Sequence, residues 1–119
     1  MIELIEGFEE NIIGIRGSGK ISRDDYLSVV VPATEAAFSE HETVRIFWQV
    51  MDDTTFEPGA IFEDALVGTK NYFGWEKIAL VTDVAFLQNA VKIFRVLMPC
   101  PTKLFASDEF DAAKKWIKE

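Results

Sequence analysis

The sequence predicts a mixed α/β fold with a mainly parallel central sheet of about five strands, an N-terminal antiparallel hairpin and about four helices. Two observations predict this fold. Short apolar runs typical of buried strands alternate with longer segments that have helical periodicity, which is the order of βαβ units. The first two apolar runs are separated only by a short polar stretch containing a glycine, which indicates a hairpin.

The first half of the chain is predicted to contain the hairpin, with strands at residues 2–5 and 11–16, and one long helix. Ser22 and Asp25 have the spacing of a capping box, so the helix is expected to start there and run to about residue 40. Pro32 falls inside this helix and predicts a kink, because its ring removes a backbone donor and crowds the preceding turn.

The second half of the chain alternates strands and helices. Strands are expected at residues 43–51, 77–82 and 103–105, with a loop at 52–59 after the first of them. Helices are expected at residues 59–72, opened by Pro58 and ended by Gly74, and at 84–97, capped by Asp83. Ser107 is expected to cap a final helix.

Composition and charge limit the possible functions. The 119 residues are 49% hydrophobic and 27% charged, with no linker or repeat, which predicts a single domain over residues 1–119. The net charge of −8 would repel a phosphate backbone and argues against nucleic-acid binding. A lone cysteine and an acidic start without a basic signal region predict a cytoplasmic protein, with the inner membrane face as an alternative location.

The segment from Gly14 to Lys20 has the spacing G-x-x-x-x-G-K of a phosphate-binding loop. The next position, which should supply a magnesium-binding hydroxyl, is occupied by Ile21, and Ser22 comes one residue too late. Gly14 is also followed by residues that continue a strand. We therefore interpret the segment as a glycine-rich turn between a strand and a helix.

No set of residues predicts catalysis. His41 is the only histidine and is expected to cap the end of the first helix, while Cys100 lies between two prolines with no basic neighbour. Asp52 and Asp53 follow a strand and could hold a divalent ion, but adjacent strand residues point to opposite faces, so turn acids are the favoured interpretation. We expect no catalytic residue, no metal ion and no cofactor.

The unusual feature of the sequence is an excess of apolar residues on two predicted helices. The helices at 59–74 and from residue 84 carry apolar side chains over an arc wider than the roughly 100° that packing on a sheet requires. Deep burial, a ligand pocket, a dimer contact and a membrane-facing patch all remain open as explanations. The glycines that bracket the first of these helices would let it swing as a lid. The candidate ligand-binding wall is Phe56, Ile61, Phe62, Ala65, Leu66, Tyr72, Phe73 and Trp75.

Several stretches together resemble the SpoIIAA-like branch of the STAS fold over nearly the whole chain. They are residues 1–3, residues 18–22 with Asp25 and Tyr26, Pro32, residues 40–41 before 44–45, and the closing residues 105–119. The resemblance implies a fold like that of anti-sigma-factor antagonists and similar to CRAL-TRIO lipid carriers. Antagonists carry a phosphorylatable serine at the start of the helix after the third strand, but residues 55–60 contain no serine, and Thr54 and Thr55 lie several residues early.

The leading functional hypothesis is a non-enzymatic protein that binds a hydrophobic or lipid-like ligand, with peripheral membrane association. The alternative is a regulatory protein-interaction module of the antagonist type, presenting residues 52–59 and the following helix to a partner protein. A homodimer formed through an apolar helix face is compatible with both hypotheses.

Overall fold

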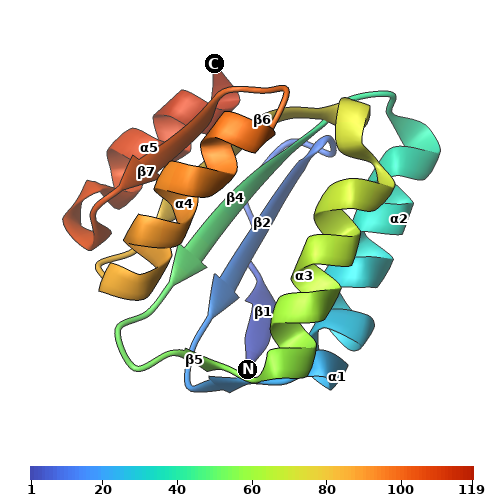
Figure 1. Ribbon diagram of the computed structural model, residues 1–119. Coiled ribbons are helices and arrows are strands. Elements are labelled where there is room, and N and C mark those ends of the chain that lie inside the picture. The colour runs from blue at the N-terminus through green and yellow to red at the C-terminus, as the bar shows by residue number, and fades with distance from the viewer.

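The computed structural model describes all residues from Met1 to Glu119 and contains the predicted five-stranded sheet, in the order β1-β2-β4-β6-β7. β1 pairs with β2 in antiparallel orientation, and all the other neighbours are parallel. The mixed α/β prediction and the N-terminal hairpin are therefore confirmed (Figure 1). The strands are β1 (Ile2–Leu4), β2 (Ile12–Gly17), β4 (Val44–Val50), β6 (Trp75–Val81) and β7 (Thr102–Phe105).

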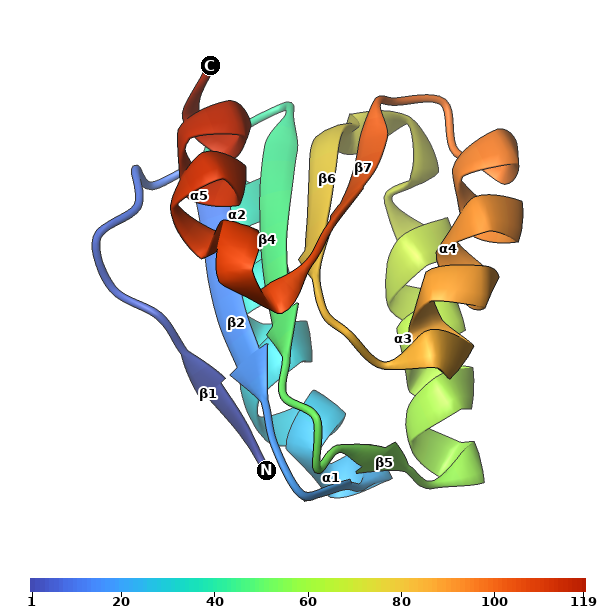
Figure 2. The ribbon, with the colours of Figure 1, turned by 90° about the vertical axis from the view of Figure 1, so that its left-hand side faces the viewer.

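Helices cover both faces of this sheet. α5 packs on one face, which we call the α5 face, and α3 and α4 lie over the other, which we call the groove face (Figure 2). The helical elements are α1 (Arg23–Asp25), the π-helical turn η1 (Tyr26–Val30), α2 (Val31–Glu40), α3 (Pro58–Lys70), the 3₁₀ turn η2 (Tyr72–Gly74), α4 (Ala85–Leu97), the 3₁₀ turn η3 (Ser107–Glu109) and α5 (Phe110–Lys118).

The first helical segment begins where the capping box predicts. The Ser22 hydroxyl accepts a hydrogen bond from the Asp25 backbone N–H at 3.2 Å, and the Asp25 carboxylate accepts one from the Ser22 backbone N–H at 2.8 Å. The sequence predicts a kink at Pro32. In the structure, the π-helical turn η1 ends two residues before this proline. A π-helical turn shifts the hydrogen-bond pattern and accommodates a residue that has no N–H to donate.

Alternation along the strands divides the core into two parts. On β4, Val44, Ile46 and Trp48 belong to the cluster under the N-terminal helices, whereas Phe47 belongs to the cluster under α5. Successive strand residues point to opposite faces, so a near-continuous apolar run such as β4 supplies both layers at once. This confirms the interpretation of residues 43–51 as a strand covered on both faces.

Three local details differ from the sequence prediction. Residues 52–59 are not all loop, because β5 (Thr55–Phe56) pairs in parallel with β3 (Lys20–Ile21). β6 begins at Trp75, two residues before the strand predicted to start at residue 77. Asp83 does not cap α4: the Thr82 hydroxyl accepts from the Val84 N–H at 3.0 Å, while the Asp83 carboxylate accepts from the Ser107 N–H at 3.0 Å.

Gly14 allows a close approach between β2 and the preceding loop. A Cβ atom at this position would lie 2.5 Å from the Phe8 ring and 3.1 Å from the Ile5 carbonyl oxygen. Gly14→Ala is therefore expected to lower the free energy of unfolding by about 1–3 kcal/mol, measured by urea denaturation.

Gly68 provides the matched control for this prediction. It lies inside α3, where a Cβ atom would meet nothing within 4 Å. Gly68→Ala should therefore raise the free energy of unfolding by about 0.5–1 kcal/mol, because alanine favours the helix. The close packing at Gly14 is contradicted if both variants unfold at the same or a higher urea concentration than the wild type.

Candidate functional site

An open groove of about 440 Å³ lies between α3 and α4 and is the main candidate site of the structure. Fourteen of the 16 residues that line it are hydrophobic. This volume falls within the range of small-molecule pockets, which are mostly apolar with a few placed polar groups. The lining residues are Tyr26, Trp48, Val50, Phe56, Ile61, Asp64, Ile78, Leu80, Phe86, Leu87, Ala90, Val91, Ile93, Phe94, Leu97 and Thr102.

The floor of the groove consists of every second residue from three adjacent strands. Trp48 and Val50 come from β4, Ile78 and Leu80 from β6, and Thr102 from β7. The parallel register places Trp48 opposite Leu80 and Ile78 opposite Thr102. Because alternate residues share a face of the sheet, the apolar strand pattern itself makes this floor apolar.

The two helical walls are held by contacts away from the floor. α3 makes its main contacts with α1 and η1, where Arg23 Nε donates to Glu63 Oε1 at 3.0 Å. α4 makes its main contacts with β7. The Tyr72 hydroxyl donates to the carbonyl oxygen of Leu97 and so links the C-terminal ends of the two walls. Val91 of α4 packs on Val50 and Leu80, whereas Trp48 and Ile78 remain partly exposed between the walls.

A single carboxylate lies in this apolar groove. Asp64 Oδ1 accepts a hydrogen bond from the hydroxyl of Tyr26 at 3.0 Å. Burial raises the pKa of Asp64, and the hydrogen bond from Tyr26 partly opposes this rise. Protein atoms surround the carboxylate, yet the residue is exposed to solvent through the open groove, so we expect water to moderate the effect of burial on its pKa.

Tyr26 is almost completely buried, with 1% of its surface exposed. Burial, and then the charge of Asp64, raise the pKa of its phenol group, so Tyr26 keeps its proton and remains a hydrogen-bond donor at neutral pH. The capping box at Ser22 and the π-helical turn that follows place the Tyr26 side chain between the sheet and α3.

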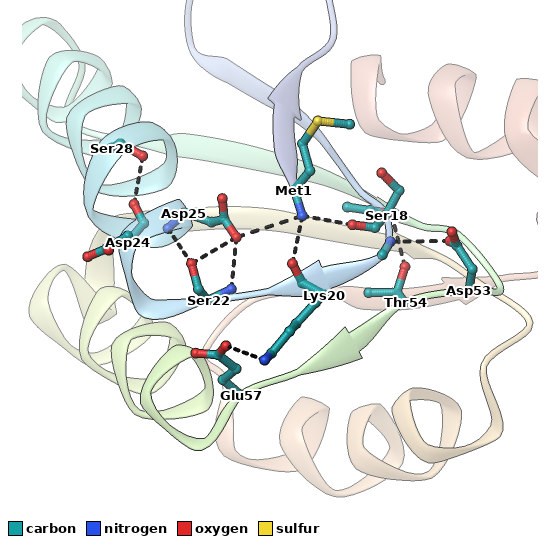
Figure 3. A network of polar contacts seen from close by, with 12 residues as sticks. Met1, Ser18, Lys20, Ser22, Asp24, Asp25, Ser28, Asp53, Thr54 and Glu57 are labelled. Atoms are coloured by element: carbon teal, nitrogen blue, oxygen red, sulfur yellow. Dashed lines mark hydrogen bonds and ion pairs between the residues drawn. The ribbon is translucent and has the colours of Figure 1, made fainter.

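A polar network fixes the N-terminal end of α3 (Figure 3). Lys20 Nζ forms an ion pair with Glu57 Oε1 at 3.1 Å, and the Glu57 backbone N–H donates to the Ile21 carbonyl oxygen at 2.9 Å. The amino group of Met1 donates to the Lys20 carbonyl oxygen at 2.9 Å. Hydrogen bonds from Ser22 lower the pKa of the neighbouring Asp25 carboxylate. The pairing of β3 with β5 therefore determines where the α3 wall begins.

The structure brings only part of the predicted ligand-binding wall into the groove. Phe56 and Ile61 line it. Trp75 does not, because it starts β6 and is buried against Phe38, with ring centroids 5.1 Å apart. Leu66 lines a smaller hollow between α2 and α3, of about 190 Å³.

The other predicted wall residues also lie outside the groove. Phe62 and Ala65 are exposed on α3, and Phe73 in η2 is 87% exposed. Tyr72 contacts Phe73 edge to face and binds the end of α4. The 3.6-residue helical period sends these side chains to different sides of α3, so one sequence segment could not supply a complete wall.

The sequence prediction missed the strand floor and Asp64. A signal for Asp64 was present, because it lies one helical turn after Ile61 and is an acid within the apolar arc of the helix. The floor residues gave no separate signal, since a buried strand has the same sequence pattern whether a helix or a ligand covers it. The sequence does predict the apolar excess on the helix from residue 84. This helix, α4, supplies most of the opposite wall: Phe86, Leu87, Ala90, Val91, Ile93, Phe94 and Leu97.

The segment resembling a phosphate-binding loop does not form a phosphate cradle. Gly14 lies within β2, where the Phe8 ring fills the space beside it. Lys20 lies in β3 and pairs with Glu57. Gly19, the turn residue between the two strands, has a φ of +60°, a value that glycine adopts readily.

The other predicted candidates lie apart from the groove. Asp53 Oδ1 accepts from the N–H of Gly19, in the turn between β2 and β3, at 3.3 Å. His41 ends α2, and its N–H donates to the Ala37 carbonyl oxygen. Its side chain lies near Glu10 and Glu40, with potential ligand atoms within 4.8 Å of one another, but both acids are exposed. Burial raises the pKa of the Cys100 thiol, which disfavours the reactive thiolate.

Comparison with known proteins identifies the family. A model of the SpoIIAA-like family matches residues 12–118. The chain belongs to the SpoIIAA-like family. A solved structure with a SpoIIAA-like fold, from an uncharacterised protein of Shewanella loihica PV-4, superimposes with a TM-score of 0.73. The two chains are 18% identical, and the match covers 98% of this chain and 92% of the other. No curated protein matches the sequence.

Family membership confirms the resemblance and the fold predicted from the sequence: this is a STAS-type, SpoIIAA-like module. None of its helices combines the length and the hydropathy needed to cross a bilayer. The match carries no ligand information, so the role of the groove has to be argued from its own geometry and chemistry.

Proposed function

We propose that this SpoIIAA-like protein binds a hydrophobic or lipid-like ligand in the groove between α3 and α4, without catalysing a reaction. One observation carries the proposal: 14 of the 16 residues around a 440 Å³ groove are hydrophobic. Apolar surface facing water is unfavourable by roughly 25 cal/mol per Å², so an apolar occupant would be stabilised by covering it.

The exposure of the walls supports this function. Phe86 on α4 is 63% exposed and Ile61 on α3 is 49% exposed, although both line the groove. Side chains of this size are normally buried, and a contiguous exposed apolar area is typical of a binding surface. The apolar excess inferred from the sequence is thus present at the surface and is not consumed by the core. Movement of α3 as a lid, which its limited contact with the sheet would permit, remains part of the proposal.

The proposal predicts that filling the groove blocks binding. Ala90 lines the groove on α4, so Ala90→Trp should occupy part of it and weaken binding of the hydrocarbon probe diphenylhexatriene by at least about tenfold. Probe fluorescence measures the affinity, and native mass spectrometry of an organic extract tests for a ligand retained during purification.

Ala112→Trp is the matched control for this experiment. Ala112 is exposed on α5, on the other side of the sheet, so this variant should bind the probe like the wild type. The proposal is overturned if the wild type binds no probe and its extracts contain no ligand, or if both variants bind equally well.

The charge of α4 supports an association with membranes. The segment from Val84 to Ser107 contains no acidic residue but includes Lys92, Arg95 and Lys103, in a protein whose net charge is −8. On the same helix Ile93 is 70% exposed and Val96 is 80% exposed. Exposed apolar side chains beside basic ones are typical of helices that lie in the interface of an anionic bilayer.

Flotation with vesicles containing phosphatidylglycerol tests this association. The double variant Ile93→Ser/Val96→Ser is expected to reduce the vesicle-bound fraction by about tenfold or more, because two apolar contacts are lost. Leu4→Ser, which removes an exposed apolar side chain from β1, should float like the wild type. If the wild type does not float and light scattering gives a dimer that the double variant lacks, the α4 surface is a homodimer contact.

A second candidate function is a regulatory protein-interaction module of the anti-sigma-factor-antagonist type, which family membership supports at least as directly. One observation indicates where such a switch would lie. Thr55 is exposed on β5, whereas Thr54 is buried, and its hydroxyl donates to the Gly17 carbonyl oxygen at 3.2 Å. Only the Thr55 hydroxyl is accessible to a kinase.

This candidate predicts phosphate on Thr55 and none on Thr54 when protein purified from its own cells is analysed by peptide mass spectrometry. Thr55→Glu should then abolish retention of one specific partner protein, because a negative charge replaces the neutral hydroxyl. Thr55→Val should retain that partner and keep the strand geometry. Unmodified Thr55 together with equal retention by both variants would rule out a phosphorylation switch at this position.

A further inference from the structure

Asp64 is the only charged residue lining the groove. The other side-chain groups there that carry a hydroxyl are Tyr26 and Thr102. Asp64 is exposed to solvent as a residue, but its carboxylate lies among apolar side chains, where a charge without an ion pair costs free energy.

The hydrogen bonds of Asp64 are incomplete. Oδ1 accepts from Tyr26, but Oδ2 has no hydrogen-bond partner, and no lysine, arginine or histidine forms an ion pair with this carboxylate. An ionised carboxylate can accept about four hydrogen bonds. Asp64 therefore keeps an unused acceptor that faces an accessible apolar space.

The neighbouring acid on the same helix shows the contrast. Glu63 is 6% exposed and pairs with Arg23 at 3.0 Å, on the side of α3 that packs against α1. Adjacent helical residues point about 100° apart, so Glu63 is neutralised within the protein while Asp64 turns to the groove. Arg23 pairs with Glu63, and no basic side chain pairs with Asp64.

Tyr26 holds the Asp64 carboxylate in place. The phenol is buried, keeps its proton and occupies Oδ1, so the rotamer of Asp64 is fixed and Oδ2 remains available. A fixed acceptor binds a ligand donor at a lower entropic cost than a mobile one.

We infer that Asp64 is the head-group site of the groove and that the occupant is an amphiphile with an apolar chain and a cationic amine head. This inference rests on the proposed function and names the ligand class of the same site. An ammonium group would supply the missing donors and the opposite charge, giving a charge-assisted hydrogen bond. A fatty-acid carboxylate or a phosphate would meet Asp64 with the same charge and be disfavoured.

Three ligands that share the same alkyl chain and differ in the head group test this inference directly. Dodecylamine, dodecanol and dodecanoic acid, each below its critical micelle concentration, compete with diphenylhexatriene for the wild-type protein at neutral pH and physiological ionic strength. We expect dodecylamine to displace the probe at a concentration at least about tenfold lower than dodecanol, with dodecanoic acid the weakest competitor.

Two variants separate the groove carboxylate from the overall negative charge. Asp64→Asn retains the shape and the acceptor for Tyr26, and should bring dodecylamine to within about twofold of dodecanol. Asp111→Asn removes one charge from an exposed position on α5 that has no ion pair. It should leave the preference for the amine intact.

The outcomes distinguish this inference from the proposed function. If the probe binds but the three heads compete equally, or the acid competes best, the head-group assignment is wrong and the groove remains a hydrophobic site. If Asp64→Asn and Asp111→Asn reduce the preference equally, bulk charge explains it and the assignment is again wrong. If no probe or amphiphile binds the wild type, the proposed function and this inference fail together.

Discussion

The groove depends on one packing constraint: α3 makes its main contacts with α1 and η1, and α4 makes its main contacts with β7, so an open space remains between the two helices over β4 and β6. A sheet with helices on both faces normally buries its apolar side chains under those helices. Here Val91 of α4 packs on Val50 and Leu80, but Trp48 and Ile78 remain partly exposed on the groove floor. The same constraint leaves the inner sides of both helices exposed, and it therefore produces the floor and the walls together.

The position of α3 is set by polar contacts together with apolar packing, because Ala60 is fully buried in the core cluster and Val67 packs against that cluster. The ion pairs of Lys20 with Glu57 and of Arg23 with Glu63 connect this helix to the segment between β2 and α2. Tyr72 connects its far end to α4. Partly exposed polar contacts of this kind each contribute little free energy, which is compatible with a wall that adjusts to an occupant.

The hydrogen bond between Tyr26 and Asp64 fixes a polar group at one place in an otherwise apolar groove. All other interactions in it are apolar and would hold a hydrocarbon in several registers, whereas a fixed carboxylate selects one end of a ligand. Burial raises the pKa of Asp64, and the hydrogen bond from Tyr26 offsets only part of the cost of its charge. Uncompensated groups of this kind occur preferentially at binding and active sites.

The main strands and helices and their order can be predicted from the sequence, because strand alternation, helical periodicity and caps such as Ser22 with Asp25 act over a few residues. It also located the apolar excess on two helices and indicated the family. It could not reveal the two-residue pairing of β3 with β5, which is too short to leave a pattern, or the hydrogen bond from the Ser107 N–H to Asp83. The tertiary structure alone decided which apolar residues share a space and where Asp64 points, because three strands and two helices distant in sequence meet there only after folding.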